Sequence, residues 1–299
     1  MTQMPVAVYG FKESQDAANR LADRLKLPVE EVAVHRFPDG ESLVQIDSMA
    51  ETAVIYRSLN DPNDKLVELM LAASILRESG STRLILIAPY LCYMRQDMAF
   101  HPGEAISQRV VGRFLDGLFD AVVTVDPHLH RTRDLADVFP TAQTAALSAA
   151  PLLVDQLRTD GISTDALLVG PDSESEQWVN AVAVPLGLEV LLGGKIRHGD
   201  KDVRVEVPRI ESANGRHIIL IDDMVSTGST LIECARQLTA AGAAKIEALV
   251  VHNLTDRIAD AALKEAGVDR IRSTDSVPHP TNDINLAPLL AAATREFLP

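Results

Sequence analysis

Short runs of Val, Ile and Leu alternate along the chain with longer segments in which apolar residues recur at helical spacing. Several of the short runs are apolar at consecutive positions, which is typical of strands covered on both faces, as in a parallel sheet between helices. The pattern predicts strands at residues 5–9, 53–57, 83–88, 121–125, 166–169, 188–192, 217–221 and 246–251. It predicts amphipathic helices at residues 65–78, 106–118 and 230–241.

This alternation predicts an α/β fold with right-handed crossovers. One sheet of eight or more strands would accommodate the runs, but two smaller sheets fit the length of 299 residues better. A small, polar stretch without charge, TAQTAALS at residues 141–148, separates two series of strand and helix units. We therefore expect two domains, at residues 1–145 and 146–299.

Composition limits the classes of partner. The chain has 28 Lys and Arg against 42 Asp and Glu, a net charge of −14, and only 4% aromatic residues. Such a surface disfavours nucleic acids and anionic membranes. Cys92 and Cys234 are too few for a disulfide framework or a Cys-rich zinc site. No secretory signal or run of about 20 apolar residues is present, so we expect a cytoplasmic protein that binds small molecules.

The strongest chemical signal is HIILIDDMVSTGSTLIE at residues 217–233. Backbone amides and hydroxyls in the 226–230 loop, at the start of a helix, can bind a phosphate dianion. Asp222 and Asp223 would repel a phosphate and suit sugar hydroxyls or a substrate-bound Mg²⁺. Together these parts fit a pentose 5-phosphate. The alternative is an ordinary helix that Ser or Thr caps after a buried strand; the run lacks the Gly-Lys-Ser/Thr of a Walker A loop.

This run resembles the phosphoribosyl-diphosphate-binding motif of type I phosphoribosyltransferases. Further segments follow in the order of one family: RFPDGESLVQ (36–45), PYLCYMRQD (89–97), GEAIS (103–107), VDPH (125–128) and GPD (170–172). Together they resemble the ribose-phosphate diphosphokinase (phosphoribosyl diphosphate synthetase) family over essentially the whole chain. Ser226, Met98 and the Gly193-Gly194 context replace charged residues usual in that family, which indicates a divergent class.

The resemblance implies two type I phosphoribosyltransferase-like domains, each a mainly parallel sheet flanked by helices, related by a pseudo-twofold. It implies transfer of the diphosphoryl group of Mg-ATP to the C1 hydroxyl of ribose 5-phosphate, which yields 5-phospho-α-D-ribose 1-diphosphate (PRPP) and AMP. ATP would bind on the N-terminal side and ribose 5-phosphate on the C-terminal side. The resemblance also implies a homo-oligomer in which a neighbouring subunit completes the ATP site.

The same resemblance assigns the site residues. Those for ribose 5-phosphate are Asp222, Asp223, Ser226, Thr227, Gly228, Ser229 and Thr230. Those for ATP are Phe37, Asp39, Glu41, Arg95, Gln96 and Asp97. The catalytic residues are Lys195, Arg197 and His128, and those near Mg²⁺ are His128 and Asp172. Lys195 and Arg197 match the family's flexible catalytic loop, where closing cations would stabilise the transferring group and exclude water.

Each assignment has a structural alternative. His128 could simply cap a loop, and Asp172 could form a turn after Pro171. Lys195 and Arg197 could lie in a solvated hairpin. The RFPDGE run contains a Pro-Asp-Gly turn, which would also present its side chains.

Two other functions share parts of this pattern. A phosphoribosyltransferase that uses the diphosphate would contain the 217–233 run but would not explain the remaining segments. A catalytically silent regulatory homologue would not need Lys195, Arg197 and His128. The C-terminal segment 273–297 resembles the family's closing strand–loop–helix. We expect a rigid loop between the prolines that flank His279, a helix at 284–293, and a role in packing.

Overall fold

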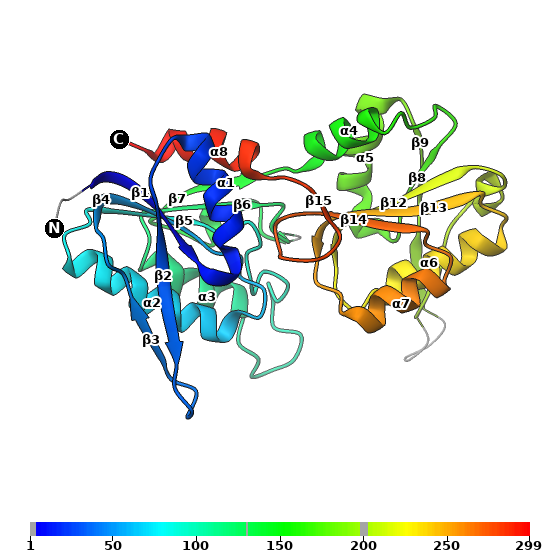
Figure 1. Cartoon of the computed structure of the whole chain (residues 1–299). Coiled ribbons are helices and arrows are strands. Elements are labelled where there is room, and N and C mark those ends of the chain that lie inside the picture. Colours follow the sequence, from blue (N-terminus) through cyan, green and yellow to red (C-terminus); the bar gives the residue numbers. More distant parts are fainter. Residues whose placement is uncertain (1–3, 130, 198–202) are drawn as a thin grey trace. The chain divides into compact units, whose positions relative to one another are not determined.

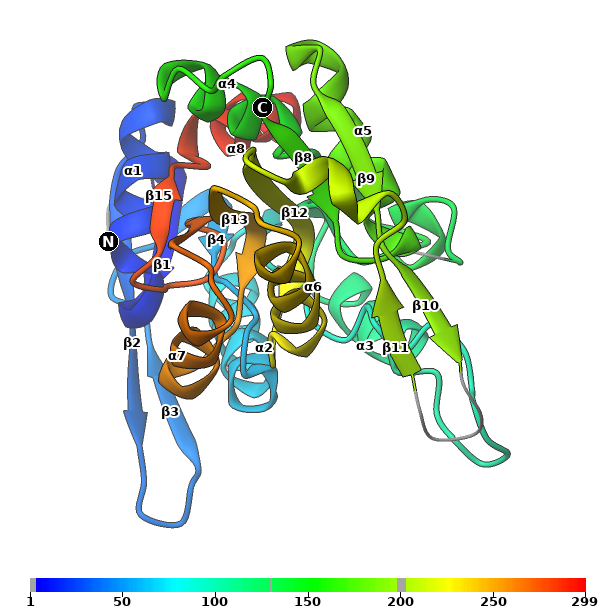
Figure 2. The same cartoon turned by 90° about the vertical axis from the view of Figure 1, so that its right-hand side faces the viewer.

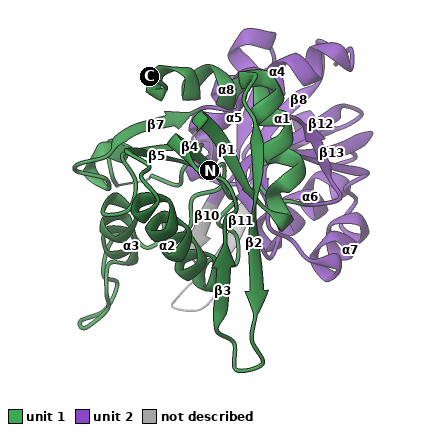
Figure 3. Ribbon diagram, turned by 60° about the vertical axis from the view of Figure 1, so that its left-hand side comes forward, with its two compact units in different colours: residues 1–147, 276–278, 286–299 green, residues 148–275, 279–285 purple. Residues whose placement is uncertain are grey.

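The computed structural model describes residues 4–129, 131–197 and 203–299, and covers only the backbone for residues 195–197 and 203–206. The chain divides into two compact units (Figures 1 and 3). Unit 1 comprises residues 1–147, 276–278 and 286–299, and unit 2 comprises residues 148–275 and 279–285. Each unit contains its own sheet, which agrees with the expectation of two smaller sheets. None of the described helices is long and apolar enough to cross a membrane.

Unit 1 is built on a seven-stranded sheet in the order β3-β2-β1-β4-β5-β6-β7. The strands are β1 (Met4–Phe11), β2 (Val29–Arg36), β3 (Ser42–Gln45), β4 (Ala50–Tyr56), β5 (Arg83–Ile87), β6 (Ala121–Val125) and β7 (Gln143–Leu147). All neighbours are parallel except β2 and β3, which form an antiparallel hairpin. The helices are α1 (Gln15–Leu25), α2 (Pro62–Glu78), α3 (Ser107–Asp116) and α8 (Ala287–Thr294), with short η1 (Lys12–Ser14), η2 (Leu135–Asp137) and η5 (Arg295–Phe297).

Unit 2 is built on a six-stranded parallel sheet in the order β15-β14-β13-β12-β8-β9. The strands are β8 (Leu167–Gly170), β9 (Glu189–Leu192), β12 (His217–Val225), β13 (Lys245–Asn253), β14 (Arg270–Thr274) and β15 (Asn282–Ile284). A separate antiparallel hairpin consists of β10 (Gly194–Arg197) and β11 (Val203–Glu206) (Figure 2). The helices are α4 (Ala150–Thr159), α5 (Glu176–Leu186), α6 (Ser229–Ala240) and α7 (Arg257–Glu265), with short η3 (Ser173–Ser175) and η4 (Ile210–Ala213).

Each sheet has one point where the direction of strand addition reverses. In unit 1, β1 leads through α1 to β2 on one side, whereas β4 leads through α2 to β5 on the other. In unit 2, β8 leads through α5 to β9, whereas β12 leads through α6 to β13 in the opposite direction. Ligands of open parallel sheets bind outside the carboxyl ends of the strands at such a reversal. The relevant pairs are therefore β1 with β4 and β8 with β12.

The central strands lie at the apolar runs predicted from the sequence. Every residue of β6 is buried, as are all but the first of β5, which is why their sequences are apolar at consecutive positions. The α/β class predicted from this pattern is confirmed, as are helices at 65–78, 106–118 and 230–241 within a few residues. The strand β7 lies inside the 141–148 stretch that was expected only to separate the domains.

The end of the chain belongs to a different unit from the one expected. Residues 286–299, which the sequence assigned to the second domain, group with unit 1. The predicted helix at 284–293 is α8, which begins at Ala287 because Ile284 pairs in β15. Leu290 and Ala291 of α8 are buried. Arg295 donates a hydrogen bond to the carbonyl of Arg24 at the end of α1 (2.6 Å).

Candidate functional site

The 226–230 segment forms a tight connection at the carboxyl end of β12. β12 ends at Val225 and α6 begins at Ser229. Gly228 has a φ of +72°, a left-handed conformation that favours glycine, and an added Cβ would lie 3.4 Å from Cδ1 of Leu263. Because Gly228 occupies the N-cap position, no side chain at that position caps α6. The hydroxyl of Thr227 accepts the amide of Ser229 only at 3.5 Å. The helix therefore presents its N-terminal amides beside the hydroxyls of Thr227 and Ser229 (Oγ1 to Oγ, 3.2 Å).

Acidic groups gather beside this segment. Asp222 is partly exposed and Asp223 is buried, and Oδ1 of Asp222 accepts the amide of Asp223 at 3.0 Å. Burial raises the pKa of Asp222 well above its ordinary value, and the negative charges of Asp223 and Asp172 raise it further. The structure therefore brings the three predicted carboxyl groups within electrostatic reach of one another, at the reversal point between β8 and β12.

Asp172 has both a structural role and a place in this cluster. Its Oδ1 accepts the amides of Glu174 (2.9 Å) and Ser175 (3.3 Å), so it caps η3. The adjacent chain is closely packed: Gly193 donates to the carbonyl of Gly170 (2.8 Å), and a Cβ on Gly193 would lie 2.3 Å from the carbonyl oxygen of Pro171. Only glycine fits there, and this contact places the start of β10 beside the loop that carries Asp172.

Lys195 and Arg197 lie on β10, next to this contact. Their backbone pairs with β11 as a regular hairpin, with Lys195 opposite Val205 and Arg197 opposite Val203. The side chains of both residues lie outside the described part of the chain, as do residues 198–202 of the expected flexible loop.

The donor groups of unit 2 fit a cation that brings other ligands with it. Among the described residues, no three His, Cys, Asp or Glu side chains are placed to hold a metal ion. Asp172, Asp222 and Asp223 are therefore not a closed metal cage. A divalent cation beside Asp222 would nevertheless offset the repulsion that raises its pKa. Mg²⁺ usually keeps several water or substrate oxygens in its coordination shell, so these residues fit Mg²⁺ bound together with a substrate.

The predicted ATP-phosphate residues follow β5 in unit 1. Arg95 is exposed. Oε1 of Gln96 accepts a hydrogen bond from the Ser107 hydroxyl (2.5 Å). The carboxylate of Asp97 pairs with the Arg131 guanidinium (2.8 Å) and accepts its amide (3.2 Å). The sequence did not single out Arg131, because a pairing between the segments after β5 and β6 leaves no local pattern. This pair joins the two segments at the carboxyl edge of the sheet.

His128 lies in the segment after β6 and is half-buried. Asp126, two residues earlier, has a φ of +35°, which is unusual for a residue with a side chain. Its amide donates to the carbonyl of Leu147 at the end of β7 (2.8 Å). The segment that carries His128 is therefore fixed in a strained turn, a conformation common at functional sites.

Phe37, Asp39 and Glu41 lie at the tip of the β2–β3 hairpin, which projects beyond the sheet of unit 1 (Figure 2). Gly40 has a φ of +93°, and the amide of Phe37 donates to the carbonyl of Glu41 (2.8 Å). The turn expected from RFPDGE is thus present. Phe37 is 39% exposed, with its ring edge-to-face on His35. Strands β1 and β4 separate this hairpin from β5, which carries Arg95 at its end.

Comparison with known proteins agrees with this arrangement. Residues 6–118 match the N-terminal domain of ribose phosphate pyrophosphokinase, and residues 142–287 match the phosphoribosyl transferase domain. The chain is 33% identical over 292 residues to a ribose-phosphate pyrophosphokinase of Methanopyrus kandleri, covering 97% of this chain and 99% of the relative. The chain belongs to the ribose-phosphate pyrophosphokinase family.

Other members agree along the full length. The family enzyme of Halobacterium salinarum is 33% identical over 283 residues, covering 94% of this chain and 97% of the relative. A crystal structure of phosphoribosylpyrophosphate synthetase from Mycobacterium smegmatis superposes with a TM-score of 0.85 at 25% identity, covering 98% of both chains. The predicted family, its enzymatic character and the type I phosphoribosyltransferase fold are therefore confirmed.

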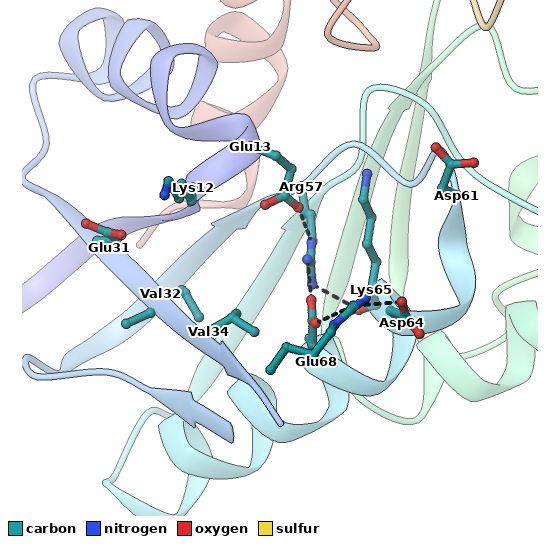
Figure 4. Close-up of a pocket in the computed structure, with 12 residues that line it drawn as sticks. Lys12, Glu13, Glu31, Val32, Val34, Arg57, Asp61, Asp64, Lys65 and Glu68 are labelled. Carbon is teal, nitrogen blue, oxygen red and sulfur yellow. Dashed lines mark hydrogen bonds and ion pairs between the residues drawn. The ribbon is translucent and has the colours of Figure 1, made fainter. Parts of the chain in front are cut away.

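Unit 1 of this family member contains a cavity of about 600 Å³ that the sequence did not predict (Figure 4). Residues after β1 and β4 line it, so it lies at the reversal point of the unit 1 sheet. Arg57 is only 3% exposed and pairs with the buried Glu68 and with Glu13 (2.8 Å). Its guanidinium also stacks on the Phe11 ring, 3.7 Å from the centroid. The prediction of a strand at 53–57 included Arg57 as a strand residue and missed this network.

Proposed function

We propose that this protein synthesises PRPP by transferring the diphosphoryl group of ATP to the C1 hydroxyl of ribose 5-phosphate, with release of AMP. The single observation that carries the proposal is the reversal point of unit 2, where a helix N-terminus with glycine at its N-cap lies beside carboxyl groups whose repulsion raises the pKa of Asp222. Membership of the ribose-phosphate pyrophosphokinase family supports the same reaction.

Ribose 5-phosphate binds at the 226–230 segment. The amides at the start of α6 and the hydroxyls of Ser226, Thr227, Ser229 and Thr230 surround the 5-phosphate. Gly228 allows the backbone to approach closely, since any side chain there would be strained. Asp222 and Asp223 accept hydrogen bonds from the sugar hydroxyls. Ser226 leaves one negative charge fewer beside the phosphate than the family's usual aspartate.

ATP binds on unit 1, and ribose 5-phosphate binds on unit 2. Arg95 binds ATP phosphate oxygens with its forked guanidinium, and Gln96, Asp97 and His128 line the same edge of the sheet. The exposed hairpin tip with Phe37, Asp39 and Glu41 contacts the adenine of a neighbouring subunit. The projection of this hairpin and its separation from β5 support a homo-oligomer.

Mg²⁺ bound with ATP would neutralise phosphate charge near His128 and Asp172. The C1 hydroxyl oxygen attacks the β-phosphorus in line. The new bond joins that oxygen to the β-phosphorus, the bond to the α,β-bridging oxygen breaks, AMP leaves, and the hydroxyl proton passes to solvent. Lys195 and Arg197 stabilise the negative charge on the transferring group. We place this reaction in the cytoplasm.

The test is an assay with ATP, Mg²⁺ and ribose 5-phosphate and without any nucleobase. Formation of AMP and PRPP in equal amounts is the expected result. A phosphoribosyltransferase would release no AMP under these conditions, and a silent regulatory homologue would show no turnover as the isolated chain. Repeating the assay with inorganic phosphate and with ADP shows whether these ions regulate the enzyme.

A further inference from the structure

His279 lies in a buried polar cluster at the carboxyl edge of the unit 2 sheet, between Pro278 and Pro280. Nδ1 of His279 lies 3.2 Å from Nδ2 of Asn253 and 3.3 Å from the amide of Thr281. The Thr281 hydroxyl lies 2.8 Å from the same nitrogen. The two amide groups are donors, so Nδ1 serves as their acceptor. Nε2 faces Oδ2 of Asp260 at 3.7 Å. The ring therefore lies between Asn253, at the end of β13, and Asp260 on α7. Its contact with Asp260 is longer than a hydrogen bond and is an electrostatic one.

The other polar groups of this cluster hold the same two elements. Oδ1 of Asn253 accepts both the amide (3.0 Å) and the hydroxyl (2.7 Å) of Thr255. That hydroxyl also lies 2.6 Å from Oδ1 of Asp260. Nδ2 of Asn253 donates its second hydrogen to the Thr281 hydroxyl (2.9 Å). Asn253 is only 1% exposed, and a buried network with its groups satisfied in this way is rigid.

Both elements held by His279 support the 226–230 segment. Asn253 lies opposite Val225, the last residue of β12, and the amide of the next residue, Leu254, donates to the Val225 carbonyl (2.8 Å). On the α7 side, Leu263 lies against Gly228, with Cδ1 3.4 Å from an ideal Cβ there. The 226–230 segment is therefore supported by the end of β13 and by α7. His279 contacts both of these elements, through Asn253 and Asp260.

We propose that His279 is a positioning residue for the phosphate-binding segment: through Asn253 and Asp260 it fixes the segment in the geometry that receives the 5-phosphate of ribose 5-phosphate. His279 itself touches no substrate. This inference rests on the proposed function, because it takes the 226–230 segment as the site of that phosphate. It replaces the expectation that the 273–297 segment serves packing alone.

The test compares three variants by steady-state kinetics, at a temperature where circular dichroism shows each to be folded. His279→Ala removes both links, whereas His279→Asn keeps an acceptor near the Nδ1 position. Arg272→Lys is the matched control, since Arg272 is buried in the same sheet and pairs with Asp160 and Glu247 (3.1 Å), away from the loop. If His279→Ala fails to fold, Asp260→Asn takes its place, because it removes the charge that Nε2 of His279 faces and keeps the ring.

His279→Ala should raise the KM for ribose 5-phosphate about tenfold, the size expected when hydrogen bonds that orient a site are lost. kcat and the KM for ATP should stay near the wild-type values, and His279→Asn should restore most of the affinity. Arg272→Lys should lower the melting temperature without changing the KM for ribose 5-phosphate. An unchanged KM in His279→Ala, with a melting temperature lowered as in the control, would overturn the inference.

A second readout separates this inference from the proposed reaction. Ribose 5-phosphate should raise the melting temperature of the wild type, and His279→Ala should lose most of that increase. If the wild type releases no AMP but shows this increase, the reaction is wrong while the role of His279 stands. If ribose 5-phosphate gives no increase in the wild type and no AMP forms, both are overturned.

Discussion

At the carboxyl end of β4 the chain places Arg57, and at the carboxyl end of β12 it places Asp222 and Asp223. The connections around the two sites follow the same scheme, because each lies where the direction of strand addition reverses. Their charge balance differs. Arg57 is buried between Glu68 and Glu13 and stacks on Phe11. Asp222 instead lies near other carboxyl groups, and its pKa is raised.

This difference separates a structural ion network from the proposed binding site. A buried charge that is paired within the protein contributes to the folded state and needs no ligand to neutralise it. Carboxyl groups that repel one another cost stability unless a bound species compensates. The fold alone does not distinguish the two reversal points, and the electrostatics of the residues after the strands does.

Among the variants considered, Glu68→Leu in unit 1 has the largest expected effect on stability. It leaves Arg57 buried without its main partner, and we expect a loss of about 3–5 kcal/mol in the free energy of unfolding, measured by urea denaturation. The KM for ribose 5-phosphate should not change. The double variant Arg57→Met/Glu68→Leu should recover most of the stability. A stable Glu68→Leu protein would show that the network of Figure 4 does not hold unit 1 together.

The second change contrasts two lysines. Lys195→Ala should lower kcat about 100- to 1000-fold, the range found when a group that stabilises transition-state charge is removed, with ATP affinity little changed. The control is Lys65→Ala, since Nζ of Lys65 lines the unit 1 cavity and already donates to the Ser58 carbonyl (2.8 Å) and to Asn60 (2.9 Å). Turnover of Lys65→Ala should stay near the wild-type rate. Equal kcat for Lys195→Ala and the wild type would remove Lys195 from the mechanism.

Asp222→Asn tests the repulsion between Asp222 and the carboxyl groups of Asp223 and Asp172. Because the folded-state pKa of Asp222 is raised, the folded protein binds more protons than the unfolded chain above the ordinary pKa of 3.8, so this carboxyl makes the wild type less stable as pH rises. The variant should therefore gain stability over the wild type, more at pH about 8 than at pH about 5, while its KM for ribose 5-phosphate rises. Asp155→Asn, at an exposed carboxyl of α4, should show neither effect. A pH-independent difference in urea midpoints would contradict the assignment.

The smallest expected effect concerns His217 at the opposite edge of the unit 2 sheet. Burial lowers its pKa below 6.5, opposed by Glu247, whose Oε2 lies 3.7 Å from Nε2, and reinforced by Lys245 and Arg272. The unfolded chain then binds the proton more readily, so stability should fall as pH drops below about 6.5. His217→Gln should flatten this part of the urea-midpoint profile. Turnover corrected for the folded fraction should follow the wild type.

The amino-acid sequence was enough to predict the central strands and the polar residues that directly follow them. Consecutive apolar residues predicted β1, β4, β5, β6, β8, β9, β12 and β13 because strands buried on both faces need no polar alternation. The 217–233 run predicted the segment between β12 and α6, since local backbone chemistry is written in adjacent residues. The hydroxyls, glycine and acids found there are the ones read from the sequence.

Features that depend on contacts between distant residues are seen in the three-dimensional structure alone. The apolar pattern did not predict β14 because its RIRST sequence looks exposed, although the resemblance implied a closing strand near this position. Arg272 is nevertheless fully buried, because Asp160 and Glu247 neutralise it. The assignment of α8 to unit 1 and the pairing of Asp97 with Arg131 likewise join segments far apart in the chain. Periodicity reports which face of one element is buried, but partner choice depends on long-range packing and charge, which no local pattern records.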